Sequence, residues 1–369
     1  MRIAWVSSGK LSGAGDALTS VSASSRYRML IPARELRALG HEIALIDSTR
    51  PLRDAERAAV QRADAVIVGK LLRNADGSFA ESARRCREIL AAVERKDERL
   101  VLDVNDDNFS VPVFRRFYEE AGSALRTWVC STDEMLAALR RHASGPMRVI
   151  ADPYEGPAGE PKAPRARASF LRGLLRRAQS AAARPGLRLL WFGHFSNAAS
   201  FASVIPQARR AAGRVRAELV CVSAPGWGLE KICKEADAPA EGFALRFVVW
   251  STATLWRELR EADLVLLPSS LSPTSEAKSA NRLVETVRAG RFAVAHPVPS
   301  YLALRDCAWI GDDLGKGIGW ALAHPRQALE RIRAGQAHVE RHFSPAVIAR
   351  AWSDVLEGSR LENRPACTP

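Results

Sequence analysis

Short apolar runs alternate with longer amphipathic stretches along most of this 369-residue chain. In the first half, the apolar runs predict strands at residues 3–6, 42–46, 65–68, 100–104, 127–130 and 148–150. The stretches between them predict helices at residues 27–39, from about 52, at about 78–93, near 111–120 and at 132–141. Short buried strands separated by amphipathic helices are typical of a parallel, doubly wound sheet.

A second series of the same kind follows a proline-rich segment. Residues 151–167, ADPYEGPAGEPKAPRAR, contain four prolines and two glycines and predict a linker. Further strands are predicted at residues 187–193, 217–222, 245–249, 263–267 and 292–295, and a last helix at 345–356. The predicted fold class is therefore α/β, with two doubly wound, Rossmann-like parallel-sheet domains that face each other across a cleft. The predicted organisation is an N-terminal domain at 1–155, a linker at 156–186, a C-terminal domain at 187–343, and a helix and tail at 344–369.

The stretch KSANRLVETVRAGRFAVAHPVPSY, residues 278–301, combines a polar helix face with a strand. Spacing by three and four residues predicts one exposed face that carries Lys278, Asn281, Arg282 and Glu285. Ala280, Leu283, Val284 and Val287 form the opposite, apolar stripe, and Gly290 is placed to end the helix. Ligands of doubly wound sheets bind beyond the carboxyl ends of the strands, so this polar face is a candidate binding site.

Two loops that follow predicted strands add candidates to this site. The loop after residues 187–192 contains Gly193, His194, Ser196 and Asn197. A glycine lets the backbone approach a phosphate closely, and the N-terminus of the following helix offers unpaired N–H groups to it. The alternative is a plain strand-to-helix turn without a ligand. Ser269 and Ser270 follow residues 264–267. Lys278 and Arg282 can neutralise a diphosphate, and Glu285 can accept two ribose hydroxyls. The alternative is a surface ion pair between Arg282 and Glu285.

The first domain carries its own candidates at strand ends. Asp106 and Asp107, in LVLDVNDDNF, can orient an acceptor hydroxyl or accept its proton. The alternative is that they cap the next helix. Asn108 is a further acceptor-side candidate beside them, whereas Asp103 is interpreted as a structural residue. The acceptor-side cations are Arg26, Arg28 and Lys70, each with a surface cation as the alternative. Gly9 and Gly13 give the first loop the flexibility to close over an acceptor.

Charge and composition limit the kinds of molecule that this chain is expected to bind. The formal net charge of +13 predicts an anionic partner, and residues 161–217 hold twelve Lys or Arg and no Asp or Glu. Within them, residues 168–183 predict a basic amphipathic helix that can lie on an anionic membrane surface, or that simply exposes arginines to water. No apolar run approaches the roughly 20 residues that span a bilayer, and the N-terminus has no secretory signal, which predicts a cytoplasmic protein. The six cysteines lack metal-ligand spacing and predict reduced, mostly buried thiols.

The order strand, LPSS, loop and KSANRLVETVRAGRFAVAHPVPSY resembles the donor-binding segment of GT-B fold glycosyltransferases, in particular the retaining group known as glycosyl-transferase group 1. The segments ADPYEG, LLWFGHFSN and SSRYRMLIPARELRALGHEI extend the resemblance over most of the chain. It implies a nucleotide-sugar site in the C-terminal domain and an acceptor site in the N-terminal domain. It further implies that Glu285 binds the ribose, that Lys278 and Arg282 bind the diphosphate, and that Val249, Trp250 and Ser251 lie against the base.

The chain departs from this family at two positions. The first of the family's two glutamates falls on Ala277, with Glu276 one position out of register, and His194 and Asn197 replace a basic pair. The resemblance implies a retaining transfer of a sugar from a nucleotide-diphosphate donor. The basic stretch at 161–217 suggests an acceptor near the inner membrane, namely a glycan or lipid-linked acceptor of cell-surface polysaccharide or lipopolysaccharide assembly. The resemblance also implies no required metal or other cofactor. The basic stretch at 161–217 has few aromatic residues and no stacking pattern, so no nucleic-acid partner is expected. The catalytic candidates are Asp106, Asp107, Lys278 and Arg282. The alternatives are a nucleotide-sugar epimerase of the same fold and a non-catalytic nucleic-acid-binding protein.

Overall fold

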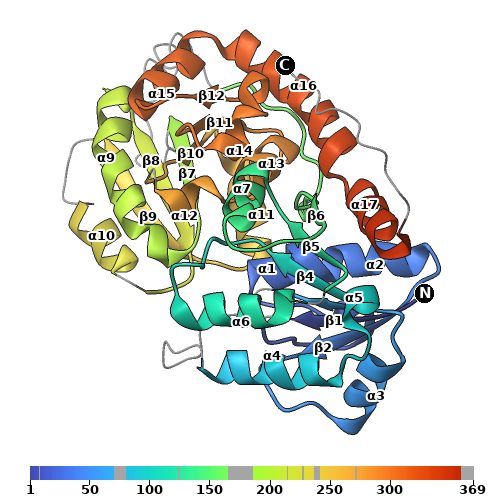
Figure 1. Ribbon diagram of the computed structural model, residues 1–369. Coiled ribbons are helices and arrows are strands. Elements are labelled where there is room, and N and C mark those ends of the chain that lie inside the picture. The colour runs from blue at the N-terminus through green and yellow to red at the C-terminus, as the bar shows by residue number, and fades with distance from the viewer. Residues whose placement is uncertain are drawn as a thin grey trace. The chain divides into compact units, whose positions relative to one another are not determined.

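The computed structural model divides the chain into two compact units (Figure 1). The N-terminal unit comprises Met1–Glu155, Glu276–Ser279 and His342–Pro369, and the C-terminal unit comprises Gly156–Ser275 and Ala280–Arg341. The structure describes residues 1–7, 9–69, 80–123, 125–164, 186–213, 215–226, 228–236, 242–270 and 272–358. The predicted basic helix at 168–183 and Lys70 lie outside the described residues.

The N-terminal unit is built on a six-stranded, all-parallel sheet of order β2-β1-β3-β4-β5-β6. Its strands are β1 (Arg2–Ser7), β2 (Glu42–Asp47), β3 (Ala65–Val68), β4 (Leu100–Val104), β5 (Thr127–Cys130) and β6 (Met147–Val149). Its helices are α1 (Ala23–Ser25), a π-helix (Arg26–Leu30), α2 (Ile31–Ala38), α3 (Asp54–Arg62), α4 (Ala80–Ala92), α5 (Lys96–Arg99), α6 (Pro112–Gly122), α7 (Asp133–Arg140) and α17 (Pro345–Glu357).

Apolar residues cover both faces of this sheet, because successive side chains of a strand point to opposite faces. Ala4 and Val6 of β1 lie in the core beneath α3, α4 and α6, whereas Ile3 and Trp5 lie in a second core on the other face. The C-terminal helix α17 completes that second core, where Trp352 packs edge-on against Trp5 with ring centroids 4.9 Å apart. The last helix of the chain therefore belongs to the N-terminal unit.

The C-terminal unit repeats the architecture, with an all-parallel sheet of order β12-β11-β10-β7-β8-β9. Its strands are β7 (Leu187–Phe192), β8 (Ala217–Ser223), β9 (Phe243–Val249), β10 (Leu264–Leu267), β11 (Phe292–Ala295) and β12 (Trp309–Ile310). Its helices are α9 (Ala198–Ala212), α10 (Leu229–Ala236), α11 (Thr252–Glu261), α13 (Asn281–Arg288), α14 (Pro299–Leu302) and α15 (Leu314–Ala323). Two further helices, α12 (Pro273–Glu276) and α16 (Pro325–Phe343), end where the chain passes into the N-terminal unit.

The structure confirms the α/β class and the two parallel sheets, and it corrects one helix. The helix after residue 278 begins at Asn281, so Lys278 precedes it and belongs to the N-terminal unit. The physical reason is that Ala277 is buried in the N-terminal core, where its carbonyl accepts a hydrogen bond of 3.1 Å from the Thr132 hydroxyl. The apolar stripe from Ala280 to Val287 is buried as predicted, and Gly290 follows the helix with φ +71°, a conformation that favours glycine.

The cysteines within the described residues are free thiols, and all are buried, as the sequence predicted: Cys86, Cys130, Cys221, Cys233 and Cys307. Burial raises the pKa of the Cys86 and Cys130 thiols to about 12 and that of Cys307 to about 11. These thiols therefore stay protonated at neutral pH and are poor nucleophiles. Cys367 lies outside the described residues.

Candidate functional site

The carboxyl edge of the C-terminal sheet has a topological switch point. From β7 the chain proceeds to β8 and β9 on one side, and then returns to place β10 on the other side of β7. Ligands of doubly wound sheets bind at such a point, beyond the ends of the two strands that flank it. Gly193 follows β7 and Ser269 follows β10, so both loops that the sequence analysis selected flank the switch point.

Arg282 and Gly193 lie side by side at this edge. A Cβ added to Gly193 would lie 3.4 Å from Nη1 of Arg282 and 3.1 Å from the ring of Trp191. Nη1 of Arg282 is buried, and within the described part of the chain it has no hydrogen-bond partner. A buried donor on a charged group is costly when unpaired, so this position favours an anionic ligand. The α13 helix positions the side chain, since Leu283, Val284 and Val287 bury its opposite face.

The residues after Gly193 lead into the N-terminus of helix α9. His194 is exposed, and its Nδ1 accepts a hydrogen bond of 3.2 Å from the Ser196 backbone N–H. Asn197 is the N-cap of the 15-residue helix α9, and its side chain makes no capping hydrogen bond there. The first N–H groups of such a helix attract anions. The loop that carries Gly193, His194, Ser196 and Asn197 thus places backbone donors at the same strand end as Arg282.

His296 is a candidate that the sequence analysis missed. It follows β11, and its Nδ1 lies 3.1 Å from the backbone N and 2.8 Å from the backbone O of Ser269, so β10 and β11 are linked at their ends. Nε2 of His296 is buried and lacks a hydrogen-bond partner among the described residues. The available signal was its position, directly after the predicted strand 292–295. Ser270, beside Ser269, is exposed.

The segment predicted to face a base lies at the end of β9. Val249 is 56% exposed, a large value for an apolar side chain, and Trp250 is half-buried. Ser251 caps α11, because its hydroxyl accepts a hydrogen bond of 3.1 Å from the Thr254 backbone N–H. An exposed valine beside a half-exposed tryptophan offers an apolar surface on which a ring can lie.

Glu285 is buried and hydrogen-bonded, whereas the sequence predicts that it lies on an exposed helix face. Its side chain is 1% exposed, and Oε2 accepts a hydrogen bond of 3.0 Å from the backbone N–H of Gly156. Gly156 itself admits no side chain, because a Cβ there would lie 2.7 Å from Oε2 and 2.8 Å from the ring of Trp256. Glu285 therefore fixes the start of the linker within the C-terminal unit. No ion pair between Arg282 and Glu285 occurs among the described residues.

The remaining site candidates from the C-terminal half of the sequence belong to both structural units. Asn281 is the first residue of α13 and is half-buried. Lys278 and Glu276 are exposed and belong to the N-terminal unit. The predicted polar helix face is therefore divided between the two units. Asn281, Arg282 and Glu285 belong to the C-terminal unit, and Lys278 belongs to the N-terminal unit.

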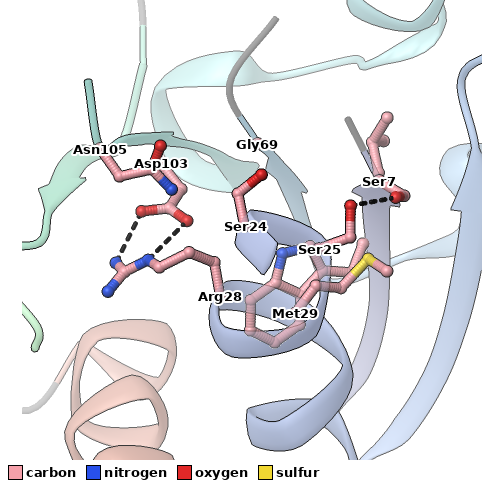
Figure 2. A pocket seen from close by; sticks show the side chains of 10 residues that line it. Ser7, Ser24, Ser25, Arg28, Met29, Gly69, Asp103 and Asn105 are labelled. Carbon is pink, nitrogen blue, oxygen red and sulfur yellow. Dashed lines mark hydrogen bonds and ion pairs between the residues drawn. The ribbon is translucent and has the colours of Figure 1, made fainter. Parts of the chain in front are cut away.

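The N-terminal unit contains a pocket at its own switch point, between β1 and β3 (Figure 2). Arg28 lines it and is not a surface cation: Nη2 and Nε contact the two oxygens of Asp103 at 2.7 and 3.1 Å, and Nη1 contacts Asp152 at 3.0 Å. Burial alone would lower the pKa of Arg28, but the carboxylates of Asp103 and Asp152 raise this pKa above its ordinary value. Arg26 is likewise buried and pairs with Glu155 at 2.8 Å.

The acidic loop after β4 does not place its predicted residues in this pocket. Asp103 and Asn105 line it, whereas Asp106, Asp107 and Asn108 are not among the lining residues. Neither Asp106 nor Asp107 caps the next helix, since the N-cap of α6 is Val111. The Asp107 carboxylate instead contacts the backbone N–H of Phe109 at 3.4 Å.

The first loop is closely packed around its glycines. A Cβ at Gly9 would lie 2.7 Å from Cβ of Ser22, and one at Gly13, where φ is +90°, would lie 2.5 Å from the Ala17 carbonyl oxygen. Both positions therefore need glycine for close approach.

Among the described residues, no group of three or more His, Cys, Asp or Glu side chains could hold a metal ion. None of the described helices combines the length and the apolar character needed to cross a bilayer.

Known structures resemble the whole chain. A sucrose-phosphate synthase from Thermosynechococcus elongatus has a TM-score of 0.64 at 12% identity, with 96% of this chain and 98% of that chain covered. A glycosyltransferase from Rickettsia africae ESF-5 has a TM-score of 0.61 at 10% identity, with coverages of 98% and 99%. An α-glucosyltransferase in complex with UDP-glucose and DNA containing an abasic site has a TM-score of 0.60 at 10% identity, with coverages of 96% and 98%.

These neighbours align over nearly their full length with both parallel sheets of this chain. The chain has the GT-B fold. The fold that the sequence resemblance implied is thereby confirmed. No protein-family description matches the chain, and no curated protein matches it in sequence.

Proposed function

We propose that this GT-B protein transfers a sugar from a nucleoside-diphosphate donor to a hydroxyl-bearing acceptor. The observation that carries the proposal is the buried, unpartnered Nη1 of Arg282 beside Gly193, at the switch point of the C-terminal sheet; the absence of a partner holds for the described residues. A guanidinium there, together with the N–H groups at the start of α9, suits a diphosphate. One of the structural neighbours was solved with UDP-glucose, which fits a donor of this class.

In the proposed reaction, the bond between the sugar and the diphosphate breaks and negative charge grows on the leaving diphosphate. Arg282 stabilises that charge, and the backbone donors after Gly193 add to it without reorganisation. As the sequence resemblance implies, we assign the ribose hydroxyls to the Glu285 carboxylate, which also accepts a hydrogen bond from the backbone N–H of Gly156. Val249 and Trp250 offer the surface for the base.

For the acceptor, we propose a glycan or a lipid-linked glycan of cell-surface polysaccharide or lipopolysaccharide assembly, with retention at the transferred sugar. The support is the sequence resemblance and the formal net charge of +13, which attracts the chain to an anionic surface. A sugar hydroxyl would be glycosylated, and its proton would leave with the departing diphosphate or with a base at the acceptor site.

Incubation of the purified chain with UDP-, GDP- and ADP-sugars tests the proposed activity. We expect release of nucleoside diphosphate from one of these donors to rise at least tenfold when neutral glycans are added. Epimerisation or free-sugar release at an unchanged rate, with or without acceptor, would instead indicate an epimerase or hydrolase. A parallel incubation replaces the glycans by DNA; glycosylated DNA as the product would move the acceptor to nucleic acid.

Membrane attachment is tested by deleting residues 168–183. We expect the deletion to reduce cosedimentation with vesicles of anionic phospholipid at least threefold, because it removes the basic amphipathic stretch, while neutral vesicles serve as the control. Equal cosedimentation of the deleted and intact chains with anionic vesicles would contradict the attachment.

A further inference from the structure

Three strand ends form one row at the carboxyl edge of the C-terminal sheet. Strand β10 pairs with β7 on one side and with β11 on the other. Counting on from the paired residues, Gly193, Pro268 and His296 occupy this row, one after each strand. Neighbouring strands lie about 4.8 Å apart, so His296 stands two strand spacings from Gly193. A diphosphate beside Gly193 spans only part of that distance, and a group attached to it reaches the rest.

The proposed donor lies along this edge in one direction. A nucleoside-diphosphate sugar is a linear molecule, in which the diphosphate separates the base and the ribose from the sugar. Val249 and Trp250, the surface proposed for the base, stand at the end of β9, whereas Gly193, beside Arg282, follows β7. In the sheet order β12-β11-β10-β7-β8-β9, the base therefore lies on one side of β7. The transferred sugar then lies on the other side, over the ends of β10 and β11.

The loop after β11 carries two polar atoms that the described part of the chain leaves unpaired. Nδ1 of His296 is held by the Ser269 backbone, 3.1 Å from its N and 2.8 Å from its O, but Nε2 is buried and has no partner there. Ser300, four residues further on in α14, has a buried Oγ that likewise lacks a partner among the described residues. Such atoms are unfavourable unless a ligand or water pairs with them. His296 as a whole is only half-buried, so it stands at the surface of the unit.

A hydroxyl is the ligand group that suits this loop. The backbone of Ser269 offers Nδ1 both a donor and an acceptor, so the ring can carry its proton on either nitrogen. Nε2 then either donates or accepts, and a sugar hydroxyl pairs with it in both cases, because a hydroxyl can do both. The same holds for the hydroxyl of Ser300.

We infer that His296 binds a hydroxyl of the transferred sugar through Nε2, and that the loop after β11 thereby helps to select the donor sugar. This inference rests on the proposed function, because the position of the diphosphate is taken from Arg282. It adds a specificity-determining residue that lies outside the motifs of the sequence resemblance. Ser269 acts here as a positioning residue, since its backbone fixes the imidazole ring. A site that hydrogen-bonds a substrate hydroxyl discriminates against sugars that lack it.

Calorimetry on two variants of the full chain tests this inference. Asparagine carries a polar atom near the place of Nδ1 and none near Nε2, whereas glutamine reaches the place of Nε2. The probes are UDP-glucose, GDP-mannose and ADP-glucose, each compared with its parent nucleoside diphosphate. For the nucleotide sugar that the unaltered chain binds most tightly, we expect at least fivefold weaker binding in His296→Asn and a loss below threefold in His296→Gln. The parent diphosphate, which has no sugar, should bind both variants within twofold of the unaltered chain.

His324→Asn is the matched control, because His324 is an exposed histidine at the end of α15. We expect this control to bind every probe within twofold of the unaltered chain. Equal losses for the nucleotide sugar and its parent diphosphate in His296→Asn would show that His296 only links the ends of β10 and β11. A larger loss in His296→Gln than in His296→Asn would show the same. Unchanged binding in both variants would assign the partner of Nε2 to water, and each of these three results overturns the inference.

The same titrations separate this inference from the proposed function. Binding of a nucleoside diphosphate by the unaltered chain, together with any of the three contrary results, removes the role of His296 and keeps the donor site. Failure of the unaltered chain to bind any of the six probes overturns the proposed donor site, and the role of His296 with it.

Discussion

Replacement of Arg282 by alanine is expected to weaken the binding of a nucleoside diphosphate at least tenfold. The Nη1 atom is buried beside Gly193, and among the described residues it has no protein partner to compete with a phosphate. Each tenfold loss corresponds to about 1.4 kcal/mol, and a charge-assisted hydrogen bond in a buried site contributes at least that much. Arg282→Lys should lose less, because it keeps the charge and gives up only the fork of donors.

The measurement is isothermal calorimetry with UDP, GDP and ADP, and Arg288→Ala is the matched control. Arg288 lies at the other end of the same helix and pairs with Glu340 at 2.5 Å. We expect the control to bind within twofold of the unaltered chain. Equal losses in Arg282→Ala and Arg288→Ala would show that helix integrity, and not a phosphate contact, explains the effect.

Replacement of Arg28 by alanine is expected to destabilise the N-terminal unit by about 3–5 kcal/mol, the usual result of breaking a buried ion pair. The guanidinium is 4% exposed and neutralises Asp103 and Asp152, which are 1% and 8% exposed. Its removal leaves two carboxylates buried without their counter-charge. The Arg28 guanidinium also lies 5.6 Å from the ring centroid of Trp352, so the mutation removes a contact with α17 as well.

Urea unfolding followed by tryptophan fluorescence measures this change. The control is Arg115→Ala, which breaks an exposed pair with Glu119, where both side chains are more than half exposed; we expect a loss below about 1 kcal/mol. A triple replacement of Arg28, Asp103 and Asp152 by apolar residues of similar volume should recover part of the stability. A loss for Arg28→Ala no larger than that for the surface control would contradict the buried-triad account.

The strands could be predicted closely because parallel strands are buried on both faces. Residues 65–68 and 292–295 are continuous apolar runs, residues 100–104 and 127–130 are apolar except for Asp103 and Thr127, and the structure has strands at these same residues. The edge strand β12 was missed, because its pairing with β11 extends over two residues only. Helix ends were less certain, as at Lys278, where a periodic pattern continued across a boundary between two units.

The candidate site was partly predictable for a similar reason. Position after a strand selects Gly193 and Ser269, since the ends of parallel strands share one edge. Contacts between distant residues cannot be read from spacing: Arg28 is 75 residues from Asp103 and 124 from Asp152. Its sequence context suggested an acceptor-side or surface cation, and only the fold brings the two carboxylates to it. The carboxylate of Glu285 was predicted for a ribose, yet its bond to Gly156 depends on the path of the linker.

A crystal structure of the chain with a bound nucleoside diphosphate tests the central claim most directly. The account predicts a phosphate oxygen within about 3 Å of Arg282 Nη1, next to the backbone of Gly193 and the first turn of α9. A diphosphate bound elsewhere, with Nη1 of Arg282 still lacking a partner, would contradict it.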